Sequence, residues 1–96
     1  MKSLITPNDW GPALWDILHY ITFNCKNLKK NSFELKELFE KHVPNIMPCN
    51  TCRKNYKNHL RLNPIRMDNC VEFSKWLVEI HNMTNKDLKK PEYKYA

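Results

Sequence analysis

Two cysteines separated by two residues, Cys49 and Cys52, are the side chains of this sequence best suited to covalent chemistry. A C-x-x-C pair is either a redox-active dithiol, which forms and opens a disulfide, or half of a zinc site. The remaining cysteines, Cys25 and Cys70, stand alone, so the second half of a zinc knuckle is missing. We therefore interpret the pair first as a redox dithiol. A small basic zinc-binding or protein-interaction module is the alternative.

The two sulfurs are expected to differ, because Pro48 places the pair at the start of a helix. The N–H groups and the dipole of a first helical turn favour a thiolate. Cys49, at or near the cap, is expected to be the more exposed sulfur and to exchange with a substrate. Cys52, one turn further, is expected to point into the protein. His42 and His59 could join a metal site, but their spacing does not mark them, and both are expected at the surface or the edge of the fold.

Length and composition limit the other function classes. The chain has 96 residues, enough for a single domain over residues 1–96. Its net charge of +6 suits a phosphate-bearing cofactor, whereas the presence of only three arginines argues against nucleic acid. The single glycine, Gly11, excludes a glycine-rich phosphate loop. No apolar run is long enough for a membrane span and no signal peptide is recognised, so we expect a cytoplasmic protein without membrane contact.

Apolar spacing and helix breakers predict an all-α protein. The first helix is expected to begin at a Thr6 cap, Pro44 is expected to end the second, and Asn69 belongs to the cap of the fourth. In order, the expected helices cover residues 7–30, 31–44, 49–62, 69–85 and 86–93. Short links favour antiparallel neighbours, so the predicted fold is an up-down four-helix bundle with a short fifth C-terminal helix.

This topology brings three separate segments to one end of the bundle. The start of the first helix, the start of the third and the end of the fourth meet there. The residues expected to converge are Trp10, Trp15, His19, Cys49, Cys52, His81, Asn82 and Asn85. At the opposite end Cys25 approaches Cys70, and the two are either buried thiols or a disulfide, within one chain or between two.

Three motifs resemble those of one family. Residues 10–19 read W-G-P-A-L-W-D-I-L-H, similar to the W-G-x-x-x-W-x-x-L-H signature of the Erv/ALR flavin-dependent sulfhydryl oxidases. The C-x-x-C follows, and residues 81–91 are similar to the family's H-N-x-V-N-x-x-L-x-K-P, with Thr84 in place of the usual valine. The motifs stand in the family's order and cover most of the chain, whose length resembles the minimal versions carried by large DNA viruses.

The resemblance implies a helical bundle that binds FAD at one end and uses Cys49 and Cys52 as catalytic residues, with Cys52 facing the flavin. The residues implied to contact FAD are Gly11, Trp15, His19, Cys52, Tyr56, His81, Asn82, Asn85, Lys86, Lys90 and Tyr93. Trp76 is a weaker candidate because, like Trp10, it belongs to an apolar helical stripe that is expected to be core. No metal ligand is expected.

The reaction implied by the resemblance is FAD-dependent thiol oxidation. A substrate dithiol would open the Cys49–Cys52 disulfide through a mixed disulfide at Cys49, and electrons would pass from Cys52 through the flavin to molecular oxygen, giving hydrogen peroxide. The chain has no second C-x-x-C or C-x-C to act as a shuttle. We therefore expect direct oxidation of a thioredoxin-like or other dithiol protein by a homodimer, in the host cytoplasm or the virion if the source is a virus.

Overall fold

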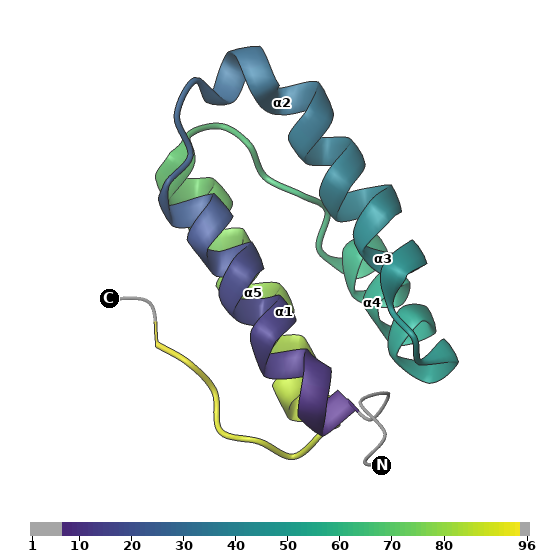
Figure 1. The fold of residues 1–96 in the computed structure, drawn as a ribbon. Coiled ribbons are helices and arrows are strands. Elements are labelled where there is room, and N and C mark those ends of the chain that lie inside the picture. Colours follow the sequence, from purple (N-terminus) through teal and green to yellow (C-terminus); the bar gives the residue numbers. More distant parts are fainter. Residues whose placement is uncertain (1–6, 95–96) are drawn as a thin grey trace.

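The computed structural model describes residues 7–94, and all regular structure within that range is helical. Thr6, the expected cap of the first helix, lies outside the described residues. The helices are α1 (Pro7–Phe23), α2 (Leu28–Glu37), a π-helical turn η1 (Leu38–His42), α3 (Val43–Ile46), α4 (Asn50–Leu62) and α5 (Cys70–Asp87). Because α2, η1 and α3 follow one another without a break, the described residues form four helical rods (Figure 1). The predicted all-α class is confirmed.

Figure 1 shows α1 and α5 side by side and running in opposite directions, with α2, α3 and α4 on the other side of the molecule. The helices enclose an aromatic core in which Phe39, Phe73 and Trp76 are fully buried. The ring of Phe39 meets the ring of Trp76 edge-on at 5.7 Å, and that of Phe73 edge-on at 5.3 Å. Burial of large aromatic side chains is the main favourable term in a domain of this size.

The first helix is shorter than predicted, and the second begins earlier. Asn24 ends α1, where its backbone N–H and its side-chain amide both donate to the carbonyl of Tyr20. Asn27 then adopts a left-handed conformation, with φ of 55°, immediately before α2. Asparagine tolerates this conformation better than most residues. The prediction of a helix to residue 30 is therefore wrong, because Cys25 and Leu28 continued the apolar spacing across the turn.

Pro44 does not end the second rod as predicted. A proline inside a helix removes one hydrogen bond and crowds the carbonyl four residues earlier. Here the turn before it widens to the π-helical η1, in which the N–H of Val43 donates to the carbonyl of Leu38, and the rod continues to Ile46. The π-turn gives the ring of Pro44 the room that a regular α-helix lacks.

The expected short C-terminal helix is not formed. Helix α5 continues to Asp87, two residues beyond the predicted boundary, and residues 90–94 are not helical. Lys89 has a φ of 57°, which ends the helical path, and Pro91 follows. The C-terminal segment is instead attached to α5 through Asn82, as described below.

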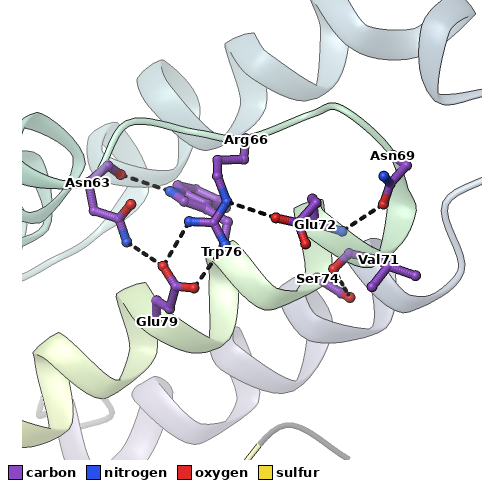
Figure 2. Close-up of polar contacts among 8 residues, drawn as sticks. All are labelled: Asn63, Arg66, Asn69, Val71, Glu72, Ser74, Trp76 and Glu79. Carbon is purple, nitrogen blue, oxygen red and sulfur yellow. Dashed lines mark hydrogen bonds and ion pairs between the residues drawn. The ribbon is translucent and has the colours of Figure 1, made fainter.

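Hydrogen bonds fix the link between α4 and α5 to the surface of α5 (Figure 2). Arg66 makes a two-pronged contact with the carboxylate of Glu79, both distances being 2.8 Å, and the side-chain amide of Asn63 donates to the same carboxylate at 3.0 Å. This bonding to Arg66 lowers the pKa of Glu79. The indole N–H of Trp76 donates to the carbonyl of Asn63 at 2.8 Å. Asn69 caps α5 as predicted, accepting from the N–H of Glu72 at 2.9 Å.

A disulfide joins the end of α1 to the start of α5. Cys25 and Cys70 are paired, with their Cα atoms 6.0 Å apart, and close a loop across 45 residues of sequence. The predicted approach of these two cysteines is confirmed, and of the alternatives left open by the sequence the structure shows the intramolecular disulfide. No helix among residues 7–94 has both the length and the apolar character needed to cross a membrane.

Candidate functional site

The C-x-x-C pair stands at the beginning of α4 and is a disulfide in the structure. Cys49 is the N-cap residue, with extended backbone, and its Sγ accepts the N–H of Cys52 at 3.1 Å. The sulfur thus takes the place that an oxygen of serine or aspartate usually fills at a helix start. The first-turn N–H groups and the dipole of α4 favour negative charge at this sulfur once the disulfide opens.

Arg53 fixes the position of the pair relative to α3. Its Nε donates to the carbonyl of Pro44 at 3.0 Å, and its Nη2 donates to the carbonyl of Met47 at 2.6 Å. These carbonyls lie at the end of α3, where few helical N–H donors remain, and the carbonyl of Pro44 also accepts the N–H of Met47 at 3.3 Å. The guanidinium group of Arg53, in the first turns of α4, therefore donates to two carbonyls at the end of α3. These bonds hold in place the turn that carries Cys49.

A cavity of about 420 Å³ opens beside Cys52. Its walls come from the first turns of α1, the residue Met47, the first half of α4, the end of α5 and the C-terminal segment. The lining residues are Trp10, Gly11, Pro12, Leu14, Trp15, Asp16, Met47, Cys52, Asn55, Tyr56, His81, Thr84, Asn85, Asp87, Leu88, Lys90 and Tyr93. Cys49 is not among them, so of the two cysteines only Cys52 lines the cavity.

Aromatic rings form one wall of this cavity. The rings of Trp15 and His81 are stacked nearly parallel, with centroids 4.1 Å apart and an angle of 5° between their planes. Behind them Nε2 of His19 lies 2.8 Å from Nδ1 of His81, so one of these nitrogens carries the proton that the other accepts. The Nδ1 atom of His19 is buried and has no hydrogen-bond partner among the described residues.

Both histidines are held in the neutral form. Burial, together with the nearby His19 and Lys90, lowers the pKa of His81 to about 4. Burial also lowers the pKa of His19, although Asp16 opposes the shift. At neutral pH this wall is therefore an uncharged aromatic surface, which suits a flat, polarisable ring system better than an anion.

Tyr56 and His59 continue the face of α4 that begins with Cys52. The hydroxyl of the buried Tyr56 donates to the carbonyl of Phe39 at 2.6 Å, and burial raises the pKa of this phenol. His59 is also buried, and its Nε2 lies 2.9 Å from Oδ2 of Asp87 on α5. The sequence predicted His59 at the surface or the edge of the fold; the surface position is wrong, since the side chain is buried and a carboxylate from another helix contacts its ring. His42 is exposed, as expected.

The C-terminal segment lies against α5 through one asparagine. The side chain of Asn82 accepts the N–H of Tyr93 at 2.7 Å and donates to the carbonyl of the same residue at 2.9 Å. The ring of Tyr93 then approaches that of His81, with centroids 4.6 Å apart. Asn82 therefore closes the cavity indirectly, by holding Tyr93 in its wall.

The structure brings most of the predicted site residues together. The predicted residues that line the cavity are Gly11, Trp15, Cys52, Tyr56, His81, Asn85, Lys90 and Tyr93. His19 and Asn82 do not line the cavity but contact residues that do: His19 contacts His81, and Asn82 contacts Tyr93. Lys86 is exposed, and Trp76 is fully buried in the aromatic core, so neither lines the cavity. Their predicted contact with a cofactor stays a prediction.

Other residues of the site were not found from the sequence. Met47, Asn55, Asp87 and Leu88 line the cavity, and Arg53 holds the turn below it. Asn55 could have been predicted from helix periodicity, since it follows Cys52 by three residues and therefore lies on the same face of α4. Asp87 could not have been predicted in this way, because its place in the site depends on the position of α5 relative to α4.

Among residues 7–94 no group of three or more metal-ligating side chains is close enough to hold an ion. The alternative interpretation, a zinc-binding module, therefore gains no support from the geometry of the described part of the chain.

Comparison with known proteins gives consistent matches. The model of the Erv1/Alr family matches residues 12–96. The chain is 32% identical over 89 residues to the FAD-linked sulfhydryl oxidase ERV1 of Oryza sativa subsp. japonica, covering 91% of this chain and 45% of the rice protein. It is 31% identical over 83 residues to the FAD-linked sulfhydryl oxidase of African swine fever virus (isolate Pig/Kenya/KEN-50/1950), covering 84% of this chain and 69% of the viral protein.

A probable FAD-linked sulfhydryl oxidase of Acanthamoeba polyphaga mimivirus is 26% identical over 85 residues. The chain spans less than half the length of the plant and yeast relatives that it matches, at 44–46% of those proteins.

Proposed function

The chain belongs to the Erv1/Alr family, and from this membership we propose that it is an FAD-linked sulfhydryl oxidase, which forms disulfides in a dithiol substrate with molecular oxygen as the final electron acceptor. The observation that carries the proposal is that the two cysteines of the C-x-x-C pair occupy different surroundings. Cys52 stands in the wall of an aromatic-lined cavity, whereas Cys49 lies outside that wall at the N-cap of α4.

The cavity has features that suit FAD. Its volume of about 420 Å³ lies within the range of ligand pockets. The neutral rings of Trp15 and His81 offer a stacking surface, and the buried, unpaired Nδ1 of His19 marks a polar position without an internal partner. Lys90 supplies a cation for a phosphate. We propose that the lining residues hold FAD with its ring system next to Cys52.

The cysteines perform the exchange with substrate. A substrate thiolate attacks Sγ of Cys49, the Cys49–Cys52 bond breaks, and Cys52 leaves as a thiolate. The second substrate thiolate then attacks the substrate sulfur of the mixed disulfide, which releases Cys49. The substrate has lost two electrons and two protons, and the C-x-x-C pair has gained the electrons. When bound, FAD supplies the two-electron acceptor for this reduced pair and the route by which the electrons reach oxygen.

This function is tested by oxygen consumption with dithiothreitol. Wild-type protein reconstituted with FAD is expected to consume oxygen and to release hydrogen peroxide. Cys52→Ser and Cys49→Ser are expected to lose turnover while retaining FAD. The matched control is Thr51→Ala, which changes an exposed residue between the two cysteines and is expected to keep full activity. Turnover that survives in Cys52→Ser would contradict the assigned role of that sulfur.

We also propose a homodimer, with an apolar stripe on α1 as the contact. Ile17 and Tyr20 are three residues apart on α1 and are 60% and 69% exposed. Residues at this spacing share one helical face, and large exposed apolar side chains that cluster usually mark an interaction surface. The physiological substrate is proposed to be a thioredoxin-like or other dithiol protein, and the cytoplasmic location stays a prediction.

A further inference from the structure

Two carboxylates in the wall of the cavity, Asp16 and Asp87, belong to none of the fixed motif positions, and Asp87 is the one held by a side chain from a second helix. Asp87 lines the cavity and occupies a variable position of H-N-x-V-N-x-x-L-x-K-P. Its Oδ2 lies 2.9 Å from Nε2 of His59, which is on α4, two turns beyond Cys52 on the same face. The acid is thus contributed by one helix and held by an imidazole from another.

The imidazole holds the carboxylate in place before any ligand arrives. The side chain of His59 is 7% exposed, whereas that of Asp87 is 46% exposed, so the pair is buried at the histidine and accessible at the acid. The other ring nitrogen of His59 lies 3.5 Å from the hydroxyl of Thr84, a second cavity residue. A side chain whose rotamer is already fixed loses less entropy when a ligand binds.

The charges around Asp87 indicate which part of a ligand it would meet. Lys90 lines the same cavity three residues later. A carboxylate accepts hydrogen bonds from hydroxyl groups and repels phosphate, whereas an ammonium group attracts phosphate. FAD carries both kinds of group, because its pyrophosphate lies between two polyhydroxyl segments. The two side chains would therefore orient a dinucleotide by its hydroxyls and its phosphates.

We propose that Asp87, positioned by His59, accepts a hydrogen bond from a sugar hydroxyl of the bound FAD. The proposal rests on the proposed function, since it names a contact to the cofactor of the same site. Asp87 is a binding residue in this account, and His59 is a positioning residue that acts only through it. Both the ribose of the adenosine half and the ribityl chain of the flavin half carry suitable hydroxyls.

The experiment pairs a protein variant with ligand analogues. Dissociation constants are measured by equilibrium titration of the flavin-free protein with FAD, with an analogue whose ribose lacks both hydroxyls, and with one whose ribityl chain lacks its hydroxyls. Asp87→Ala is expected to weaken FAD binding about tenfold, as for the loss of one hydrogen bond to a charged group. The penalty is expected to vanish for one analogue, which identifies the sugar. Asp68→Ala, an exposed acid in the link before α5, is the matched control and should leave all three constants unchanged.

The outcomes separate this assignment from the proposed function. The same penalty for all three ligands, or no penalty for FAD, would overturn the contact while leaving the function in place. Wild-type protein that binds none of the three ligands would contradict the function and the contact together. If Asp87→Ala does not fold, Asp87→Asn replaces it, and the same dependence on one sugar, with a smaller penalty, is expected.

A second pair of variants tests the role of His59. His59→Phe keeps a ring but removes the N–H, and is expected to weaken FAD binding in the wild-type background while adding nothing to Asp87→Ala. His59→Gln, which restores a donor, is expected to recover part of the affinity. Additive penalties in the double variant would show that His59 affects FAD binding independently of Asp87 and would overturn its positioning role.

Discussion

At the scale of single residues, the two sulfurs of the C-x-x-C pair differ in their surroundings. Cys49 caps α4 and accepts the N–H of Cys52, and Cys52 faces the cavity. Pro48 before the pair predicted a helix start, and the position of each cysteine in the first turn predicted two unequal sulfurs, because both depend on local helix geometry. The burial of His59 could not be predicted in this way, because it depends on Asp87, which is 28 residues away on another helix.

The buried histidines lead to a prediction about pH. Because the pKa of His81 falls from 6.5 to about 4 on folding, the unfolded chain takes up a proton at a higher pH than the folded chain does. Below pH 6.5 this difference favours the unfolded state, and the loss of stability grows until the pH reaches about 4. Above that window His81 adds no pH dependence. The unfolding midpoint of the flavin-free protein, measured by circular dichroism, is therefore expected to decrease as the pH is lowered from 7 to 5.

Two variants isolate the contribution of His81. His81→Phe keeps a ring against Trp15 but cannot titrate, so the decline between pH 7 and pH 5 should become shallower. His42→Asn removes an exposed histidine and should leave the decline as it is. A decline of the same steepness in His81→Phe and in the wild type would contradict this explanation.

Gly11 allows folding and ligand binding to be separated. A Cβ atom added at Gly11 would meet nothing within 4 Å, although the residue lines the cavity. Gly11→Ala is therefore expected to stabilise α1 by about 0.5–1 kcal/mol, because alanine loses less backbone entropy in a helix. The same methyl group would occupy space beside the ligand and weaken FAD binding. Urea unfolding and an FAD titration measure the two effects, and tighter FAD binding in Gly11→Ala would show that the cofactor does not approach this position.

At the scale of elements, the chain was predictable where one local signal decides. The capping of α5 by Asn69 and the span of α4 follow from capping and breaker residues, and both were predicted. The end of α1 was not predicted, because the apolar spacing continues across the turn at Asn27. The continuation of the helix beyond Pro44 was not predicted either, because a π-turn makes room for the proline ring. In both places the misleading signal, apolar spacing in the first and a helix-breaking proline in the second, was the stronger one in the sequence.

The disulfide between α1 and α5 gives a prediction at this scale. Cys25→Ser combined with Cys70→Ser removes a cross-link that closes a 45-residue separation. Losing a loop constraint of that size is expected to cost about 2–4 kcal/mol in the free energy of unfolding, measured by denaturant titration. The pair lies at the opposite ends of α1 and α5 from the cavity, so FAD affinity and thiol oxidation should persist at temperatures where the variant is folded. Loss of turnover in a folded, flavin-loaded double variant would mean that this disulfide takes part in the chemistry.

At the scale of the whole molecule, the described residues form a body of 43 × 25 × 24 Å with the cavity near one end. The convergence of the three motifs at that end was predictable because short links between helices dictate antiparallel neighbours. The closure of the cavity by the C-terminal segment was not, because it depends on two hydrogen bonds between Asn82 and Tyr93 rather than on helix periodicity.

The proposed homodimer is tested by mass in solution. Wild-type protein is expected to elute with twice the chain mass of 11.6 kDa in light scattering coupled to size exclusion. Tyr20→Glu places a charge on the exposed face of α1 and is expected to shift the protein to a monomer. Phe33→Glu, on the exposed face of α2, tests whether that helix shares the contact. A wild-type monomer at all concentrations would refute the dimer.

The central claim is that Cys52 passes electrons from a thiol substrate to FAD bound in the adjacent cavity. Its most direct test is the absorbance spectrum of the FAD-loaded protein, recorded without oxygen before and after addition of dithiothreitol. The oxidised flavin band is expected to bleach in the wild type, to return when oxygen is admitted, and to persist in Cys52→Ser. A protein that binds no flavin, or a band that dithiothreitol leaves unchanged in the wild type, would contradict the account.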